Sequence, residues 1–167
     1  MSSVEIGSVV VSDREPDRAE TVVRSLGPVA SAEAWHPRIL DGATALVVAA
    51  PVTAAARTLS GAVSIEVIEA ALAAGVAVVT VGDGLAEVEA LLRLEPAARA
   101  AGVSLVIGAG MSPGLSDVLA RHAAATFEAV EEVHVAKAGT GGPACARQHH
   151  RALGAEALDW RDGEWVH

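Results

Sequence analysis

Hydrophobic positions along the chain form short continuous runs that alternate with longer segments of helical spacing. The short runs predict strands at Val9–Val11, Val29–Ala34, Ala45–Ala49, Val76–Val81 and Val103–Ile107. Spacing, caps and stop signals predict helices at Glu15–Leu26, Ser64–Ala74, Leu85–Ala101 (kinked at Pro96) and Leu115–Ala125. This alternation with short loops predicts an α/β fold, a parallel sheet with helices on both faces. The Ala45–Ala49 run is apolar throughout, which is typical of a strand buried on both sides.

The pattern changes after Glu131. Val133 and Val135 alternate with His134 and Ala136, which predicts a half-exposed strand. A glycine-rich loop follows, and the tail from Ala157 to Val166 is expected to form a hairpin turned by Asp162-Gly163. We therefore expect one domain over residues 1–129 and the beginning of a second, α+β domain over residues 130–167.

Composition and charge narrow the class of protein. The chain has 167 residues, of which 51% are hydrophobic, so it can build a core and is not disordered. Its formal net charge of −9, with 12 Lys and Arg, argues against nucleic acid as a partner. The apolar stretches are too short to span a bilayer, and Met1–Gly7 lacks the features of a signal peptide, so we expect a cytoplasmic protein that does not enter membranes. The histidines lack metal-ligand spacing, so no metal is expected.

Asp13 follows the first predicted strand, where dinucleotide-binding folds place the acid that holds the adenosine ribose. Its neighbour Arg14 could stack on adenine or meet a 2′-phosphate; alternatively, Asp13 starts a turn and Arg14 is solvated. The phosphate-binding glycines should lie about 20 residues before such an acid, yet Gly7 is the only glycine there. The expectation is therefore a sheet whose first strand and phosphate loop are absent from this sequence.

Three further segments follow predicted strands. They are Ala50-Pro51, Asp83 in a Gly-Asp-Gly turn, and Met111–Gly114 within the glycine-rich segment Gly108–Gly114. Ligands in open α/β sheets bind outside the carboxyl ends of the strands, so these residues should share one edge. The glycine-rich segment could bind an anion at a helix start, but Pro113 has no N–H, and a sharp turn lining a pocket is the preferred interpretation. Asp83 could equally be a turn and helix-start residue.

Donors for a carboxylate substrate stand near the C-terminus. Lys137, Arg147 and His149 are the candidates, although the same residues are also what the polar face of a helix would carry. The single cysteine, Cys145, is interpreted as a packed residue and not as a nucleophile. The sequence therefore identifies no catalytic acid or base.

Taken together, these motifs resemble the saccharopine dehydrogenase-like NAD(P)-dependent oxidoreductases. The residues that carry the resemblance, in chain order, are Val9–Arg14, Ala49–Pro51, Ala73–Val76 with Asp83, Ala100–Val103, the segment Gly108–Leu115 and the segment Gly139–Ala144. The resemblance implies a Rossmann-like NAD(P)-binding domain followed by a substrate domain, with hydride transfer at an amino-acid-like C–N centre. It also implies a set of cofactor-binding residues: Asp13, Arg14, Ala50, Pro51, Asp83, Gly110, Met111, Pro113 and Gly114.

The departures from that family suggest reduced activity. The sequence lacks the opening strand and the G-x-G-x-x-G loop, and it stops after Trp165, where the second domain should continue. Binding of NAD or NADP by this chain alone is therefore expected to be poor, because that loop makes most pyrophosphate contacts. A sheet without its first strand also exposes edges that invite a homo-oligomer. The alternative to an enzyme is a non-catalytic binding or assembly module with a truncated Rossmann-like fold.

Overall fold

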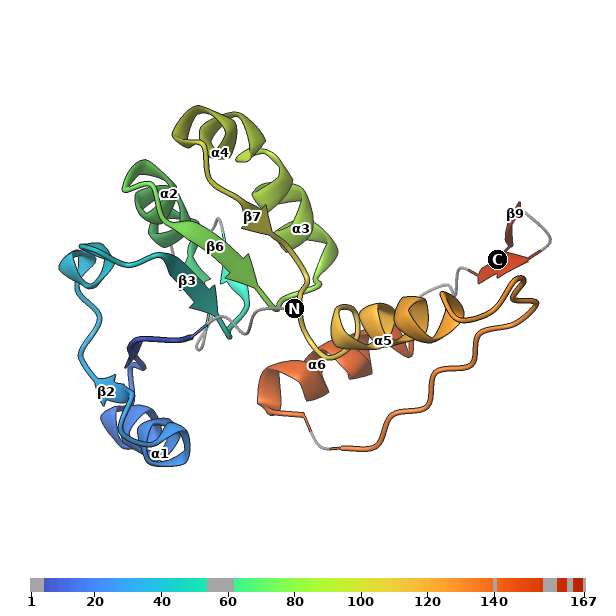
Figure 1. The fold of residues 1–167 in the computed structure, drawn as a ribbon, viewed down its shortest axis with the longest axis horizontal. Coiled ribbons are helices and arrows are strands. Elements are labelled where there is room, and N and C mark those ends of the chain that lie inside the picture. Colours follow the sequence, from blue (N-terminus) through green and yellow to red (C-terminus); the bar gives the residue numbers. More distant parts are fainter. Residues whose placement is uncertain (1–4, 54–61, 140, 155–158, 162–163, 167) are drawn as a thin grey trace.

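The computed structural model describes residues 5–53, 62–139, 141–154, 159–161 and 164–166. The chain is a mixed α/β protein with parallel sheets and, within these residues, six α-helices and a 3-10 helix at Pro37–Leu40 (Figure 1). The strands are β1 (Val9–Val11), β2 (Ala30–Ala32), β3 (Ala45–Val48), β4 (Val52–Thr53), β5 (Val63–Ser64), β6 (Ala77–Thr80), β7 (Leu105–Val106), β8 (Asp159–Arg161) and β9 (Glu164–Val166). The helices are α1 (Pro16–Leu26), α2 (Ile65–Ala73), α3 (Leu85–Leu92), α4 (Glu95–Ala101), α5 (Leu115–Ala124) and α6 (Pro143–Ala152).

Most predicted elements form where the local signals place them. Pro16 opens α1, and its fixed φ suits a first helical turn. Ser64 caps α2, its hydroxyl accepting a hydrogen bond from the backbone N–H of Glu66 at 3.4 Å. The single helix predicted over Leu85–Ala101 is interrupted before Pro96, giving α3 and α4. The predicted C-terminal hairpin is confirmed by the antiparallel pairing of β8 with β9, while its turn residues 162 and 163 lie outside the described residues.

The main sheet has the order β3-β6-β7, with all strands parallel. The buried core lies on one face of this sheet, where Val48, Val78 and Thr80 are covered by helices α2, α3 and α4 (Figure 1). Hydrophobic residues at the centre of the core include Ile68 and Leu72 of α2, which are 0% and 1% exposed. The carboxyl ends of the three strands consequently meet at one well-anchored edge.

The opposite face of this sheet is open, and the expectation of helices on both faces is wrong for the described residues. Val47 and Val106 project from that face and are 65% and 46% exposed. The expectation that the apolar run Ala45–Ala49 is buried on both sides is therefore wrong, because Val47 is exposed. In Figure 1, α5 and the elements after it extend to one side of the sheet instead of covering it.

The predicted sheet is also divided in two. Strands β1 and β2 pair with each other in parallel but form a sheet separate from β3-β6-β7. Strands β4 and β5, which were not predicted, form a further two-stranded parallel sheet. The carbonyl oxygens of Thr44, just before β3, and of Val48, at its end, face β6: they accept hydrogen bonds from the N–H groups of Ala77 and of Val81, which directly follows β6. Because successive residues of a strand point their backbone groups to opposite sides, those of Ala45 and Val47 face the outer edge.

The strand predicted around Val133 and Val135 does not form. Residues 131–139 belong to no described strand or helix, and no backbone–backbone hydrogen bond joins residues 128–139 to another described residue. The reason is the lack of a neighbouring strand, because an extended segment becomes part of a sheet only through pairing. No described helix combines the length and the hydrophobicity needed to cross a membrane.

Candidate functional site

Three loops meet at the carboxyl edge of the β3-β6-β7 sheet, and we refer to this region as the carboxyl edge. It consists of Ala49–Thr53, Val81–Gly84 and Gly108–Gly114. The second and third loops touch: a β-carbon placed on Gly110 would lie 3.1 Å from the carbonyl oxygen of Val81, and one on Gly108 would lie 3.8 Å from that of Gly82. The predicted candidates Ala50, Pro51, Asp83, Gly110, Met111, Pro113 and Gly114 all belong to these loops.

Glu87 is the residue of this region that the sequence analysis missed. Its Oε1 accepts a hydrogen bond from the backbone N–H of Val52 at 2.9 Å and so joins α3 to β4. The same carboxylate covers Gly82, where any β-carbon would collide with it. The available signal was its place in the first turn of α3, four residues after Asp83, where acidic residues are favoured by the helix dipole.

The environment of Glu87 changes its protonation. Partial burial raises the pKa of the Glu87 carboxyl because water no longer stabilises the charged form. The hydrogen bond from Val52 acts against this rise, and the negative charge of Asp83 adds to it. The result is a carboxyl group more easily protonated than an ordinary surface Glu, at the edge where a ligand would sit. Perturbed carboxyls of this kind are candidates for functional groups.

The Gly108–Gly114 turn forms a closed unit. The N–H of Gly114 donates to Oδ2 of Asp117 at 2.7 Å, and the N–H groups of Leu115 and Ser116 donate to the carbonyls of Gly110 and Met111. A β-carbon on Gly114 would collide with the backbone of Gly110, and its φ is +121°. The helix-start N–H groups are thus already used, and the Asp117 carboxylate repels anions. This turn does not provide a cradle for a pyrophosphate.

Thr80 ends β6 beside this turn. Its carbonyl oxygen accepts the N–H of Ala109 at 2.8 Å, which fixes the start of the loop after β7. Its hydroxyl is fully buried and has no hydrogen-bond partner. A buried hydroxyl without a partner costs stability, so Thr80 supports the edge through its backbone and weakens the core through its side chain.

Asp13 and Arg14 lie in the loop between β1 and α1, next to the β1-β2 sheet. Oδ1 of Asp13 accepts a hydrogen bond from the backbone N–H of Glu15 at 2.8 Å, which is the turn role considered as the alternative in the sequence. Both side chains are exposed. Within the described residues, no hydrogen bond joins Asp13 or Arg14 to the carboxyl edge.

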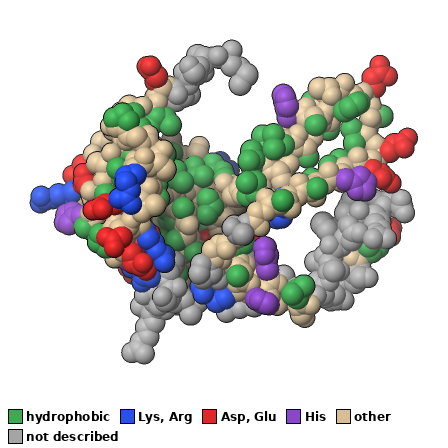
Figure 2. Space-filling view, turned by 90° about the horizontal axis from the view of Figure 1, so that it is seen from below, with side chains coloured by type: hydrophobic (Ala, Val, Ile, Leu, Met, Phe, Trp, Pro, Cys, Tyr) green, Lys and Arg blue, Asp and Glu red, His purple; other side chains and the backbone are tan. Residues whose placement is uncertain are grey.

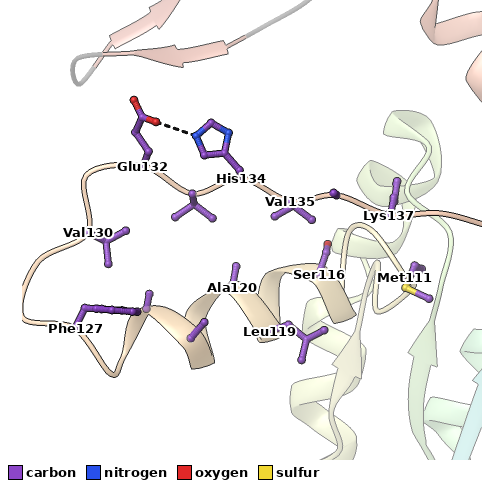
Figure 3. A pocket seen from close by; sticks show the side chains of 14 residues that line it. Met111, Ser116, Leu119, Ala120, Phe127, Val130, Glu132, His134, Val135 and Lys137 are labelled. Atoms are coloured by element: carbon purple, nitrogen blue, oxygen red, sulfur yellow. Dashed lines mark hydrogen bonds and ion pairs between the residues drawn. The ribbon is translucent and has the colours of Figure 1, made fainter.

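A second region of interest is a groove between α5 and the extended segment Val130–Lys137, with a volume of about 390 Å³. Figure 3 shows Val130 and Val135 pointing toward α5, whereas Glu132 and His134 point away and bond to each other at 2.8 Å. The side chains of Glu132, His134 and Val135 therefore alternate in direction as they would in a strand, although the segment pairs with no neighbouring described strand. The lining is mainly apolar, with Lys137 among its polar members.

The remaining candidates lie on α6. Arg147 and His149 are exposed, and Nε2 of His149 is 3.9 Å from Sγ of Cys145, one helical turn earlier. Cys145 is also exposed, so its interpretation as a packed residue is wrong. Among the described residues, no group of three His, Cys, Asp or Glu side chains is arranged to hold a metal ion.

Comparison with known proteins adds no family to these observations. No protein-family model, no curated protein and no solved structure matches the chain.

Proposed function

We propose that this chain is an NAD(P)-dependent oxidoreductase-type protein that resembles the saccharopine dehydrogenase class, with the carboxyl edge holding the nicotinamide end of the cofactor. The observation that supports this proposal is the meeting of the Ala50-Pro51, Asp83 and Gly108–Gly114 loops at one edge. Open α/β sheets bind ligands at that edge.

The chain fits one end of a dinucleotide better than the middle. The N–H groups of Gly114, Leu115 and Ser116 at the start of α5 are already bonded, and Asp117 places a negative charge beside them, which disfavours a pyrophosphate there. Asp13 is assigned to the adenosine ribose and Arg14 to the adenine or a 2′-phosphate, following the resemblance. The dinucleotide should then bind weakly, because no strong phosphate site holds the pyrophosphate between its nicotinamide and adenosine ends.

Bound nicotinamide would supply or accept the hydride, and the residues of this chain would orient it. Glu87 is the group best suited to hold a proton near the edge, since burial and Asp83 both favour its neutral form. The substrate is an amino-acid-like molecule with a carboxylate, for which Lys137, Arg147 and His149 are the proposed donors.

Titration of the purified chain with NADH and NADPH, followed by nicotinamide fluorescence, tests this function. The proposal expects saturable binding with a dissociation constant in the range of about 0.1 to 5 mM. Gly114→Val should abolish the binding, because its side chain would displace the turn from Gly110. Gly7→Val is the matched control, since a β-carbon at Gly7 meets no atom within 4 Å. Absence of binding to either cofactor at about 10 mM would refute the proposal.

The second candidate function is a non-catalytic assembly module. It is favoured by one observation, the extent of exposed hydrophobic surface. This surface includes Val47 and Val106 on the open sheet face, Leu119 of α5, and Phe127 just after α5. Figure 2 shows hydrophobic side chains open to solvent over much of this view. Monomeric proteins rarely expose large apolar patches. Self-association without any cofactor binding would support this candidate over the enzyme.

A further inference from the structure

The extended segment Glu131–Lys137 has the properties of a strand without a neighbour. It alternates apolar and polar side chains, and Val133 and Val135 are 58% and 55% exposed. No backbone–backbone hydrogen bond joins the segment to any other described residue. Exposed extended backbone with high β-propensity is a template for pairing with another strand.

The sequence of the segment is complementary to itself. When two copies run antiparallel with His134 opposite His134, Val133 lies opposite Val135, and Glu131 lies opposite Lys137. In this register, the valines lie opposite each other, Glu132 lies opposite Ala136, and each end of the ribbon carries one acidic and one basic side chain. Opposite charges and β-branched pairs across strands stabilise a sheet.

Neighbouring registers lose this match. Moving the centre to residue 133 puts Glu131 opposite Val135, and moving it to residue 135 puts Lys137 opposite Val133. A shift of one strand by a single residue turns its side chains to the other face and places His134 opposite Val133 or Val135, so the two valines no longer meet. Only the register centred on His134 combines the Val133–Val135 pairs with the Glu131–Lys137 pairs.

We propose that two copies of this chain associate through Glu131–Lys137, which pairs with the same segment of the second copy as a two-stranded antiparallel ribbon. The ribbon places both α5 helices on one of its faces, toward which Val130 and Val135 already point (Figure 3). The contact is isologous, so each Glu131–Lys137 pair occurs twice. This interface does not involve the carboxyl edge and does not depend on the proposed cofactor.

Sedimentation equilibrium of the full chain and its charge variants tests the interface. The wild-type chain should be a dimer that dissociates at micromolar concentrations, and Glu131→Lys or Lys137→Glu should each weaken it by about tenfold or more, because both attractive pairs become repulsive. The double variant E131K/K137E should restore wild-type affinity within about threefold. Glu128→Lys is the control, since it changes the net charge by the same amount as Glu131→Lys outside the segment.

Two outcomes would overturn the proposal. A wild-type chain that stays monomeric at about 200 µM excludes the dimer. A dimer in which Glu131→Lys behaves like Glu128→Lys, or in which the double variant does not recover, excludes this register. Circular dichroism of each variant verifies the fold. As a separate measurement, His134→Cys in a Cys145→Ser background should form an interchain disulfide on oxidation, because residues directly opposite in an antiparallel pair are close enough to be bridged.

Discussion

Oε1 of Glu87 accepts the backbone N–H of Val52 at 2.9 Å, although the two residues are 35 positions apart in the chain. This bond ties helix α3 to the loop that follows β3 and holds the carboxylate over Gly82. It makes Glu87 both a structural link and a carboxyl group of raised pKa at that edge.

Replacing Glu87 should change the pH dependence of stability in a defined direction. The pKa of Glu87 is higher in the folded than in the unfolded state, so folding takes up a proton between the two values. Its contribution to stability is then fully present below the unfolded pKa, near pH 4, and is lost as the pH rises through the folded pKa. Glu87→Gln keeps the acceptor for Val52 but removes this dependence.

Urea unfolding of both proteins across this pH range measures the effect. The free energy of unfolding of the wild type, minus that of Glu87→Gln, should decrease as the pH rises and then level off. Compared with Glu87→Gln, Glu87→Ala, which also removes the acceptor for Val52, should be less stable by about 1 kcal/mol at every pH. A difference that increases with pH would contradict the proposed environment of Glu87.

Thr80→Val should stabilise the chain by about 1 kcal/mol. The substitution keeps the shape of the side chain and removes a buried hydroxyl that has no partner. Thr80→Ser is the control, because it keeps the hydroxyl and removes the buried methyl group, and it should destabilise by about 1 kcal/mol. Thermal unfolding checks both; a destabilised Thr80→Val would mean that the hydroxyl is satisfied after all.

Gly114→Ala should destabilise the chain by about 2 kcal/mol or more. Its φ of +121° is unfavourable for any residue with a β-carbon, and that carbon would collide with the backbone of Gly110. Gly7→Ala, at a position without close neighbours, should have an effect smaller than about 0.5 kcal/mol. Chemical denaturation measures both, and equal effects would contradict the tight turn described here.

Asp13→Asn separates the two roles considered for Asp13. Asparagine can still accept the N–H of Glu15 and so preserves the turn, but it lacks the carboxylate proposed for the adenosine ribose. NADH should therefore bind several-fold more weakly to the variant, while reduced nicotinamide mononucleotide, which lacks adenosine, should bind both proteins equally. Parallel fluorescence titrations measure the affinity of both proteins for each ligand. Unchanged NADH binding would mean that Asp13 stabilises the turn and does not bind the adenosine ribose.

Local signals in the sequence predicted most elements of the fold. Helix starts depend on residues close by in the chain, and α1, α2 and α4 begin at or next to Pro16, Ser64 and Pro96. The pairing of strands depends on partners distant in the chain, and for that reason the division between β1-β2 and β3-β6-β7 could not be predicted. The same applies to Val133 and Val135, whose alternation is correct while the sheet it indicates has no second strand.

The carboxyl edge was predictable in outline. Asp83 and the Gly108–Gly114 segment follow strands, and parallel strands bring such loops together. Glu87 was missed because its importance comes from contact with Val52 and Gly82, which no local pattern encodes. The closed state of the turn, with Asp117 on Gly114, likewise depends on side-chain geometry.

The most direct test of the proposed function is a two-dimensional ¹H–¹⁵N NMR titration of the chain with NADH. The account predicts saturable shifts of backbone amides at the carboxyl edge, in particular Gly82, Asp83, Gly110 and Met111, at concentrations up to about 5 mM. Reduced nicotinamide mononucleotide should move the same amides in the same direction. Shifts confined to other parts of the chain, or no shifts at all, would contradict the assignment of this edge to a nicotinamide cofactor.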